Sequence, residues 1–380
     1  DAFLLEVDTM TGLISNFLDQ VVNEFIELVK SFLAKKQSLP KIGKLDLTEF
    51  ETFILKRLGK PDKSIIVPPL TGVDAGVIDI GNNQVLIVAE DPIFQVPKQS
   101  PEMFGWYTVH IGASDVAVLG VKPKYLTYTL LMPPNTSTQN FEIIVDSIHR
   151  AAVELDLSIV GGHTGYYPVG ASPLIGGITV FAIADKDNYV TPAGAQPNDV
   201  VILTKGPAIE ATALLAGLYE PEMRKYYPGR LIDKAKSLSR QITVVQDALT
   251  AMETGGVTAM HDATEGGVLG GLFEVANASK VGMELDETLI IYPEEVQMVC
   301  DFLHIDPLTA ISEGSLIITA ASKSAQKIIK QLNAVGIQSS IIGNVVNNTQ
   351  KRIIKRRNGN IIPLEIQADP FWPAFFKGIQ

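Results

Sequence analysis

Cysteine is nearly absent from this chain, since Cys300 is the single one among 380 residues. One cysteine excludes an intrachain disulfide and a zinc site built from several thiolates, and it is typical of a reducing compartment. We therefore expect a cytoplasmic setting. Cys300 lies within the apolar helical pattern EEVQMVCDFL, which favours a buried structural thiol over a nucleophile.

Basic residues are also in deficit, with 31 Lys and Arg against 42 Asp and Glu and a net charge of −11. Nucleic acids and anionic membrane surfaces require a concentrated positive field, so we expect neither as a partner. No apolar run approaches the roughly 18 residues of a membrane-spanning helix. The first residues lack the basic and apolar pattern of a secretory signal, and we expect none.

Two glycine-rich fingerprints of nucleotide-binding folds are missing as well. Neither GxGxxG nor GxxxxGK followed by Ser or Thr occurs, which counts against a Rossmann or P-loop site. Phosphate binding stays open, because Mg²⁺ and backbone N–H groups can hold phosphate without a basic patch.

Apolar residues make up 46% of the chain, enough for a large packed core. Residues 13–35 repeat apolar side chains every three or four positions, which predicts a helix that either packs within the chain or binds a partner. A second helix is expected over residues 48–57. From Ser64 onward, short β-rich runs alternate with helical patterns, and this predicts an α/β or α+β fold.

A Pro- and Gly-rich turn within residues 191–206 leads into the apolar strand pattern VVILT and indicates a domain boundary. The pattern predicts an N-terminal helical extension, an N-terminal domain, a C-terminal domain and a tail, over residues 1–45, 46–188, 189–366 and 367–380. Within the C-terminal domain we expect helices over residues 209–218 and 232–253.

Carboxylates recur beside strands and at helix positions: Asp74 after a Gly turn, Asp91 at the end of QVLIVAED, Asp115 in a helical pattern, and Asp262 and Glu265 in HDATEGG. Carboxylate oxygens are hard ligands suited to Mg²⁺. Each acid alone is equally consistent with a turn or capping role. The metal interpretation depends on their meeting in the fold.

The stretch SIVGGHTGYYPVG runs from a strand pattern into two glycines that let backbone approach a ligand closely. The four residues of interest are Gly161, Gly162, His163 and Thr164. His163 is a candidate acid, base or phosphate donor, and a structural histidine is the alternative.

The stretch HDATEGGVLGG precedes a helical pattern. Asp262 or Thr264 is expected to cap the helix, and Glu265 suits the positive end of its dipole. Gly266 and Gly267 would expose N–H groups as an anion cradle. Glycines in a helix start cost roughly 1 kcal/mol each, so we expect them to serve ligand binding rather than stability.

Seven motifs in collinear order resemble one superfamily: GVDAGV, VAED, SDVAVLGVKP, IVGGHT, GAQPNDVVILTKG, HDATEGG and ISEGSLII. This is the superfamily of aminoimidazole ribonucleotide (AIR) synthetase and the hydrogenase maturation protein HypE. Thiamine-monophosphate kinase and selenophosphate synthetase belong to it too. The resemblance implies two α/β domains, and a homodimer in which the N-terminal sheets of two subunits form a shared barrel.

The same resemblance implies that ATP and Mg²⁺ bind in a cleft lined by these motifs. Mg²⁺ ligands would be Asp74, Asp91 and Asp115. The nucleotide would contact two further groups of residues: Gly161, Gly162 and Thr164, and then Asp262, Thr264, Glu265, Gly266 and Gly267. His163 and Asp115 are the candidate catalytic residues.

The sequence departs from the superfamily at informative places. Val73 stands where many members have an acid, and His163 stands where HypE commonly has Asp. The ending DPFWPAFFKGIQ lacks the cysteine tail of HypE. The resemblance implies an ATP-dependent enzyme that activates an oxygen of an unidentified small substrate by phosphoryl transfer, as in hydrogenase maturation. The alternative is a nucleotide-binding scaffold with little or no catalysis.

Overall fold

The computed structural model describes residues 42–45, 47–168, 170 and 172–379. Contacts divide the chain into two units, Asp1–Leu45 and Asp46–Gln380, and all helices and strands below belong to the second. The helix predicted over residues 13–35 lies outside the described residues. The helix predicted over 48–57 is a short one, α2 (Leu47–Glu49), continued by a π-helical segment, η1 (Phe50–Ile54).

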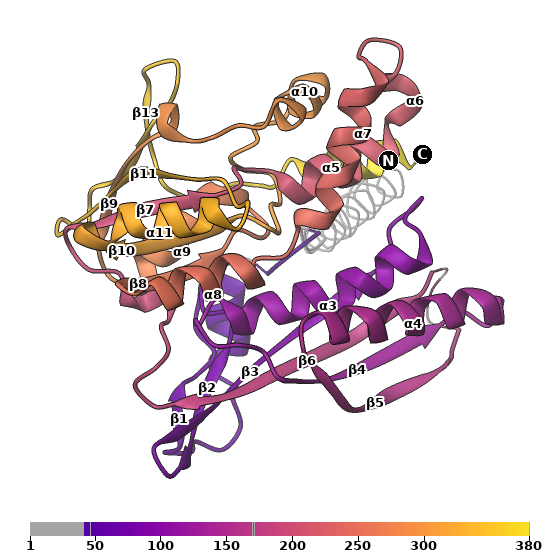
Figure 1. Ribbon diagram of the computed structural model, residues 1–380, viewed down its shortest axis with the longest axis horizontal. Coiled ribbons are helices and arrows are strands. Elements are labelled where there is room, and N and C mark those ends of the chain that lie inside the picture. Colours follow the sequence, from indigo (N-terminus) through magenta and orange to yellow (C-terminus); the bar gives the residue numbers. More distant parts are fainter. Residues whose placement is uncertain (1–41, 46, 169, 171, 380) are drawn as a thin grey trace, which may run out of the picture. The chain divides into compact units, whose positions relative to one another are not determined.

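The first half of this unit is a six-stranded sheet in the order β1-β2-β3-β6-β4-β5. All neighbours are antiparallel except β4 and β5, which run parallel. Helices α3 (Pro101–Ala117) and α4 (Thr138–Glu154) cover one face (Figure 1). The strands are β1 (Ile65–Val67), β2 (Gly76–Gly81), β3 (Gln84–Phe94), β4 (Tyr125–Met132), β5 (Ser158–Tyr166) and β6 (Leu174–Asp185).

Helix α3 is the central helix of this half. The Ser100 side chain caps its N-terminus by accepting from Met103 N, and Pro101 occupies the first helical position. Thirteen of its seventeen residues are buried, because the sheet covers one side and α4 and α8 cover others. Gly112 lets the helix lie close to β6, since a Cβ there would be 2.8 Å from Ile178.

The second half is a seven-stranded sheet in the order β13-β12-β9-β11-β7-β10-β8, antiparallel except for β12 and β9. The fully buried β7 shows the two-residue period: Val200 and Ile202 face one hydrophobic core, whereas Val201 and Leu203 face another. The strands are β7 (Asp199–Thr204), β8 (Val257–Asp262), β9 (Gly282–Asp286), β10 (Leu316–Ala321), β11 (Ser339–Val346), β12 (Arg352–Lys355) and β13 (Ile361–Pro363).

Helices of the second half fall into separate cores. Helices α8 (Val245–Thr254) and α11 (Ser322–Ala334) contribute to the core that continues into the first half. Helix α9 (Gly267–Ala278) packs on the other face of the sheet. A third core joins α5 (Ile209–Leu218), α7 (Gly229–Ser237), α10 (Glu294–Leu303) and α12 (Phe371–Gly378); a short helix, α6 (Glu220–Met223), follows α5.

The continuous helix predicted over residues 232–253 is wrong. The chain forms α7, a 3₁₀ turn η3 (Leu238–Gln241) and then α8, with a break over residues 242–244. Ile242 and Val244 turn into the core shared with the first half. Lys205 Nζ compensates the freed carbonyls, because it donates to Gln241 O at 3.3 Å and to Thr243 O at 2.6 Å.

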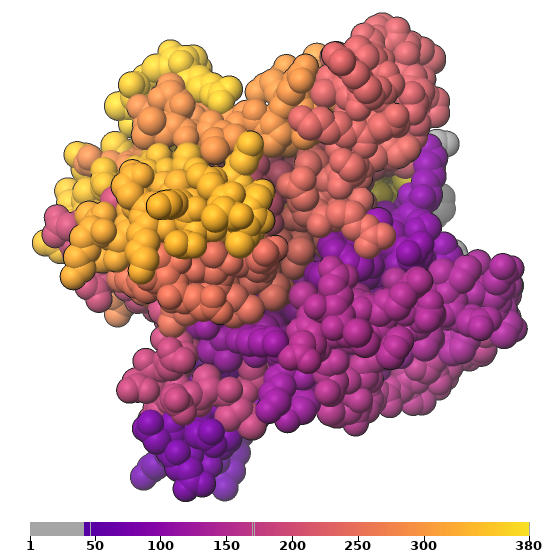
Figure 2. All heavy atoms as spheres, in the orientation of Figure 1, coloured from indigo at the N-terminus to yellow at the C-terminus, as the bar shows by residue number. Residues whose placement is uncertain are grey.

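The two halves pack through α3 and α8, where Val244 N donates to Ser114 Oγ at 3.1 Å. Figure 2 shows the purple atoms of the first half meeting the coral atoms of the second along this line. The predicted boundary between residues 188 and 189 falls between β6 and β7. Among the described residues, no helix is long and apolar enough to cross a membrane.

Candidate active site

Four carboxylates from four separate elements meet where the two halves join. Asp74 precedes β2, Asp91 lies near the end of β3, Asp115 lies in the last turn of α3, and Asp262 ends β8. The charges of Asp91, Asp262 and Asp74 all act on Asp115. The structure thus brings together the three acids that the sequence suggested as Mg²⁺ ligands, and it adds Asp262 to them.

The mutual repulsion of these acids acts on the pKa of Asp115. Burial, the charges of Asp91, Asp262 and Asp74, and a hydrogen bond to Asp91 together raise the pKa of Asp115 well above its usual range. A cation among these carboxylates would offset their mutual repulsion. The site is therefore electrostatically suited to cations.

His261 lies between two of the carboxylates and is almost fully buried. Its Nδ1 is 2.7 Å from Asp74 Oδ2 and its Nε2 is 2.8 Å from Glu274 Oε2. An imidazole that contacts carboxylates through both nitrogens donates two protons and carries a positive charge. Although burial lowers the pKa of His261, Asp74 and Glu274 raise it further, and the net pKa lies well above its usual range.

Asp74, His261 and Asp262 each place a potential metal-ligand atom within 4.8 Å of the others. His261 is nevertheless a poor ligand in this arrangement, since both of its nitrogens are occupied as donors. The carboxylates are the residues able to hold a metal. Sequence reasoning missed His261 and Glu274, although the histidine opens the HDATEGG motif.

The turn after β8 differs from the expectation. Asp262 is the last residue of β8 and pairs with Leu316, and neither Asp262 nor Thr264 occupies the N-cap position of α9. The N-cap residue is Gly266, which has a left-handed backbone with φ 83° and no side chain that could cap the helix. Gly267, with φ 63°, has a structural cause of its own, because a Cβ there would lie 2.6 Å from Ala310 O. Gly266 and Gly267 are therefore required by the backbone conformation and packing at this helix start, whereas the sequence predicted that they serve ligand binding.

The second glycine group lies apart from the acids within one chain. Gly161, Gly162, His163 and Thr164 belong to β5, the exposed edge strand, and β6 and β4 separate β5 from β3. His163 Nε2 is 2.6 Å from Tyr167 Oη. The roles predicted for these four residues stay predictions.

Comparison with known families is decisive for the fold. The N-terminal domain of AIR synthase related proteins matches residues 72–185, and the C-terminal domain matches residues 196–356. The chain belongs to the AIR synthase related family. The family and the two-domain α/β fold expected from the seven motifs are both confirmed.

Individual relatives are more distant. The chain is 27% identical to the carbamoyl dehydratase HypE of Rhizobium leguminosarum over 247 residues, which cover 64% of this chain and 68% of that protein. It is 28% identical to a selenide, water dikinase of Pelobacter propionicus over 331 residues, 77% of this chain and 89% of that protein.

Solved structures show the same fold at lower identity. A crystal structure of the hydrogenase maturation protein HypE matches with a TM-score of 0.64 and 23% identity, covering 82% of this chain and 96% of that one. HypE in complex with ATP matches with a TM-score of 0.59 and 22% identity, covering 88% and 98%.

Proposed function

We propose that this protein is an ATP-dependent enzyme that activates an oxygen of a small substrate by phosphoryl transfer. The observation that supports it most directly is the convergence of Asp74, Asp91, Asp115 and Asp262 from four elements. Acids that perturb one another this strongly are characteristic of functional sites.

The donor set fits Mg²⁺. Carboxylate oxygens are the ligands that this ion prefers, and a divalent cation would relieve the repulsion that raises the pKa of Asp115. Asp74, Asp91 and Asp115 would hold the ion, with Asp262 beside them. Bound Mg²⁺ would neutralise the charge on the phosphates of ATP. The His261 cation would hold the Asp74 carboxylate in place.

The relatives supply the reason for choosing ATP. One solved neighbour is HypE in complex with ATP, and the relatives include a carbamoyl dehydratase and a selenide, water dikinase. The residues that follow Asp262 and Ala263 would contact the nucleotide: Thr264, Glu265, Gly266 and Gly267. A role for His163 in the same site would require another chain to bring β5 to these acids.

Cys300 is unsuited to thiol chemistry. It is buried in α10, as the sequence predicted, and burial together with Asp301 and Asp306 raises the pKa of its thiol to about 12. Cys300 therefore does not accept a group from a substrate in the proposed reaction. The second substrate is a small molecule with an oxygen nucleophile.

Calorimetry of MgATP binding, with ATP hydrolysis measured in parallel, tests the proposal. We expect binding that requires Mg²⁺ and slow hydrolysis without a second substrate. Absence of MgATP binding would overturn the site assignment. A nucleotide-binding scaffold is the second candidate, favoured by Val73 at a position where the superfamily resemblance implies an acid. Tight binding without hydrolysis, and hydrolysis gained by Val73→Asp, would support it.

We also propose a homodimer formed through the first sheet. The edge strand β5 leaves Ile159 and Val160 exposed at 40% and 55%, and an exposed edge with apolar side chains pairs readily with another chain. Light scattering should give twice the chain mass, and Val160→Lys should shift the protein to monomer. A wild-type monomer at concentrations of about 100 times those of the assay would contradict the dimer.

A further inference from the structure

Asp369 is a single carboxylate that joins three backbone segments. Its Oδ2 accepts from Gly266 N at 3.0 Å and its Oδ1 accepts from Phe371 N at 2.8 Å. The backbone N–H of Ile311, in the loop before β10, also donates to it. Asp369 lies beyond residue 356, where the matched family domain ends. Nothing in the family match therefore assigns this residue.

The segment that carries Asp369 is anchored independently of the turn it reaches. Phe371, at the start of α12, is buried in the core around α5. Tyr219 Oη donates to Ala374 O at 2.6 Å. On the other side, Trp372 Nε1 lies 3.5 Å from Glu265 Oε2. Helix α12 is thus held on α5, while Asp369 extends from it to the start of α9.

The turn at the start of α9 needs such an acceptor from outside. Gly266 and Gly267 both have left-handed φ values, 83° and 63°, and the N-cap position provides no side-chain acceptor. Glycine backbone is the most permissive in conformation, so the direction of these N–H groups depends on what they bind. The carboxylate of Asp369 performs the capping from a position 103 residues further along the chain.

Holding Asp369 in this place is electrostatically unfavourable. Burial raises its pKa, the three backbone donors lower it and the charge of Glu265 raises it, with a net rise above the usual value. Glu210 is buried beside it, and burial together with Asp369 and Glu265 raises the pKa of Glu210 to about 8. The carboxylate is therefore placed among other acids, where a stability role alone would favour a neutral acceptor.

We propose that Asp369 is a positioning residue for the phosphoryl-transfer site: by accepting from Gly266 N it fixes the conformation of the turn 264–267 beside Asp262, where the turn would meet the ligand. This inference rests on the proposed function. It assigns part of the site to the segment after the family domain.

The test compares Asp369→Asn with Tyr219→Phe. The first keeps the side-chain shape but removes one acceptor oxygen from the turn. The second removes the other polar anchor of α12 and leaves the turn untouched. Amide hydrogen exchange of the peptide spanning residues 263–270, the KM for MgATP and kcat are measured for both variants, with melting temperature as a measure of folding.

We expect Asp369→Asn to speed exchange in this peptide and raise KM for MgATP, each by about fivefold, the size expected for a lost capping contact. Tyr219→Phe should lower the melting temperature about as much as Asp369→Asn does. It should leave the hydrogen exchange of this peptide and the KM for MgATP unchanged. Equal effects of the two variants, or unchanged exchange in Asp369→Asn, would overturn the inference. A wild type without MgATP binding would overturn the proposed function instead, while exchange would still decide whether Asp369 holds the turn.

Discussion

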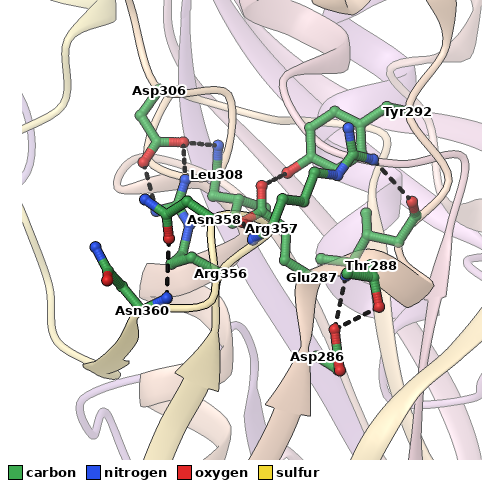
Figure 3. Close-up of polar contacts among 11 residues, drawn as sticks. Asp286, Glu287, Thr288, Tyr292, Asp306, Leu308, Arg356, Arg357, Asn358 and Asn360 are labelled. Atoms are coloured by element: carbon green, nitrogen blue, oxygen red, sulfur yellow. Dashed lines mark hydrogen bonds and ion pairs between the residues drawn. The ribbon is translucent and has the colours of Figure 1, made fainter.

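Two groups of acidic side chains in this protein differ in what neutralises them. Beside the β12–β13 hairpin, Arg356 donates to Glu287 at 2.7 Å and to both oxygens of Asp306 at 2.7 and 3.1 Å (Figure 3). Tyr292 Oη and Arg357 N complete the bonds of Glu287. At the candidate site, in contrast, the described residues give Asp91 and Asp115 no ion pair with an Arg or Lys.

The difference separates a structural network from the one that we propose to be functional. The Arg356 network satisfies its acids with a bidentate guanidinium and neutral donors, which is how a fold stabilises buried charge. The candidate site instead places acids against one another and raises the pKa of Asp115. Such an arrangement lowers stability and is characteristic of functional sites.

Asp115→Asn should separate the two groups most sharply. We expect ATP hydrolysis to fall at least about 100-fold, because the variant loses an acid that we propose to hold Mg²⁺ against the phosphates. The unfolding free energy should stay the same or rise, since the variant removes a repelled carboxylate. Steady-state kinetics and urea unfolding measure the two effects, and Asp156→Asn, at an exposed surface pair, is the control. A large loss of stability would show that Asp115 is a structural acid.

Arg356→Met should show the opposite pattern. The variant leaves Glu287 buried without its cation, and we expect the free energy of unfolding to fall by about 2 to 3 kcal/mol. This is less than for a fully buried ion pair, because Arg356 and Asp306 are partly exposed. Hydrolysis at a temperature where the variant is folded should be unchanged. The control is Lys351→Met, which breaks the exposed pair with Glu284 and should cost no more than about 0.5 kcal/mol.

The sequence was sufficient for much of the fold and for the acids. Periodicity predicted the helix over 209–218 with the bounds observed. Asp74, Asp91 and Asp115 could be identified from the sequence because each lies in a short motif, and the motifs occur along the chain in the order of the superfamily.

The side chains that bond to these acids could not be predicted from the sequence. His261 bonds to Asp74, 187 residues away, and to Glu274, which lies within an apolar helical pattern. Nothing in local sequence indicates which buried charges will meet across domains. At the break over residues 242–244 the chain bonds to Lys205, and at the start of α9 it bonds to Asp369; both are tertiary contacts that local propensity does not indicate.

His261 gives the comparison a pH dependence. Its folded pKa is raised well above the unfolded value of about 6.5, so its contribution to stability is complete below that value and is lost as pH rises through the folded pKa. His261→Asn should cost about 2 kcal/mol at neutral pH and flatten the decline at alkaline pH. Urea unfolding from pH 6 to 9 in EDTA measures this, with exposed His149→Asn as control. Parallel curves for His261→Asn and wild type would contradict the cationic role.

Added Mg²⁺ should produce the smallest effect and the most specific one. An ion that binds the folded protein stabilises it by about 1.4 kcal/mol when it reaches about ten times its Kd. We expect this gain in the wild type and in Arg356→Met, because that variant leaves the acids of the candidate site unchanged, and we expect its loss in Asp115→Asn. Melting curves with MgCl₂, against NaCl of equal ionic strength, measure the gain. An equal gain in all three proteins would place the ion elsewhere, and the distinction between the two groups of acids would then rest on activity alone.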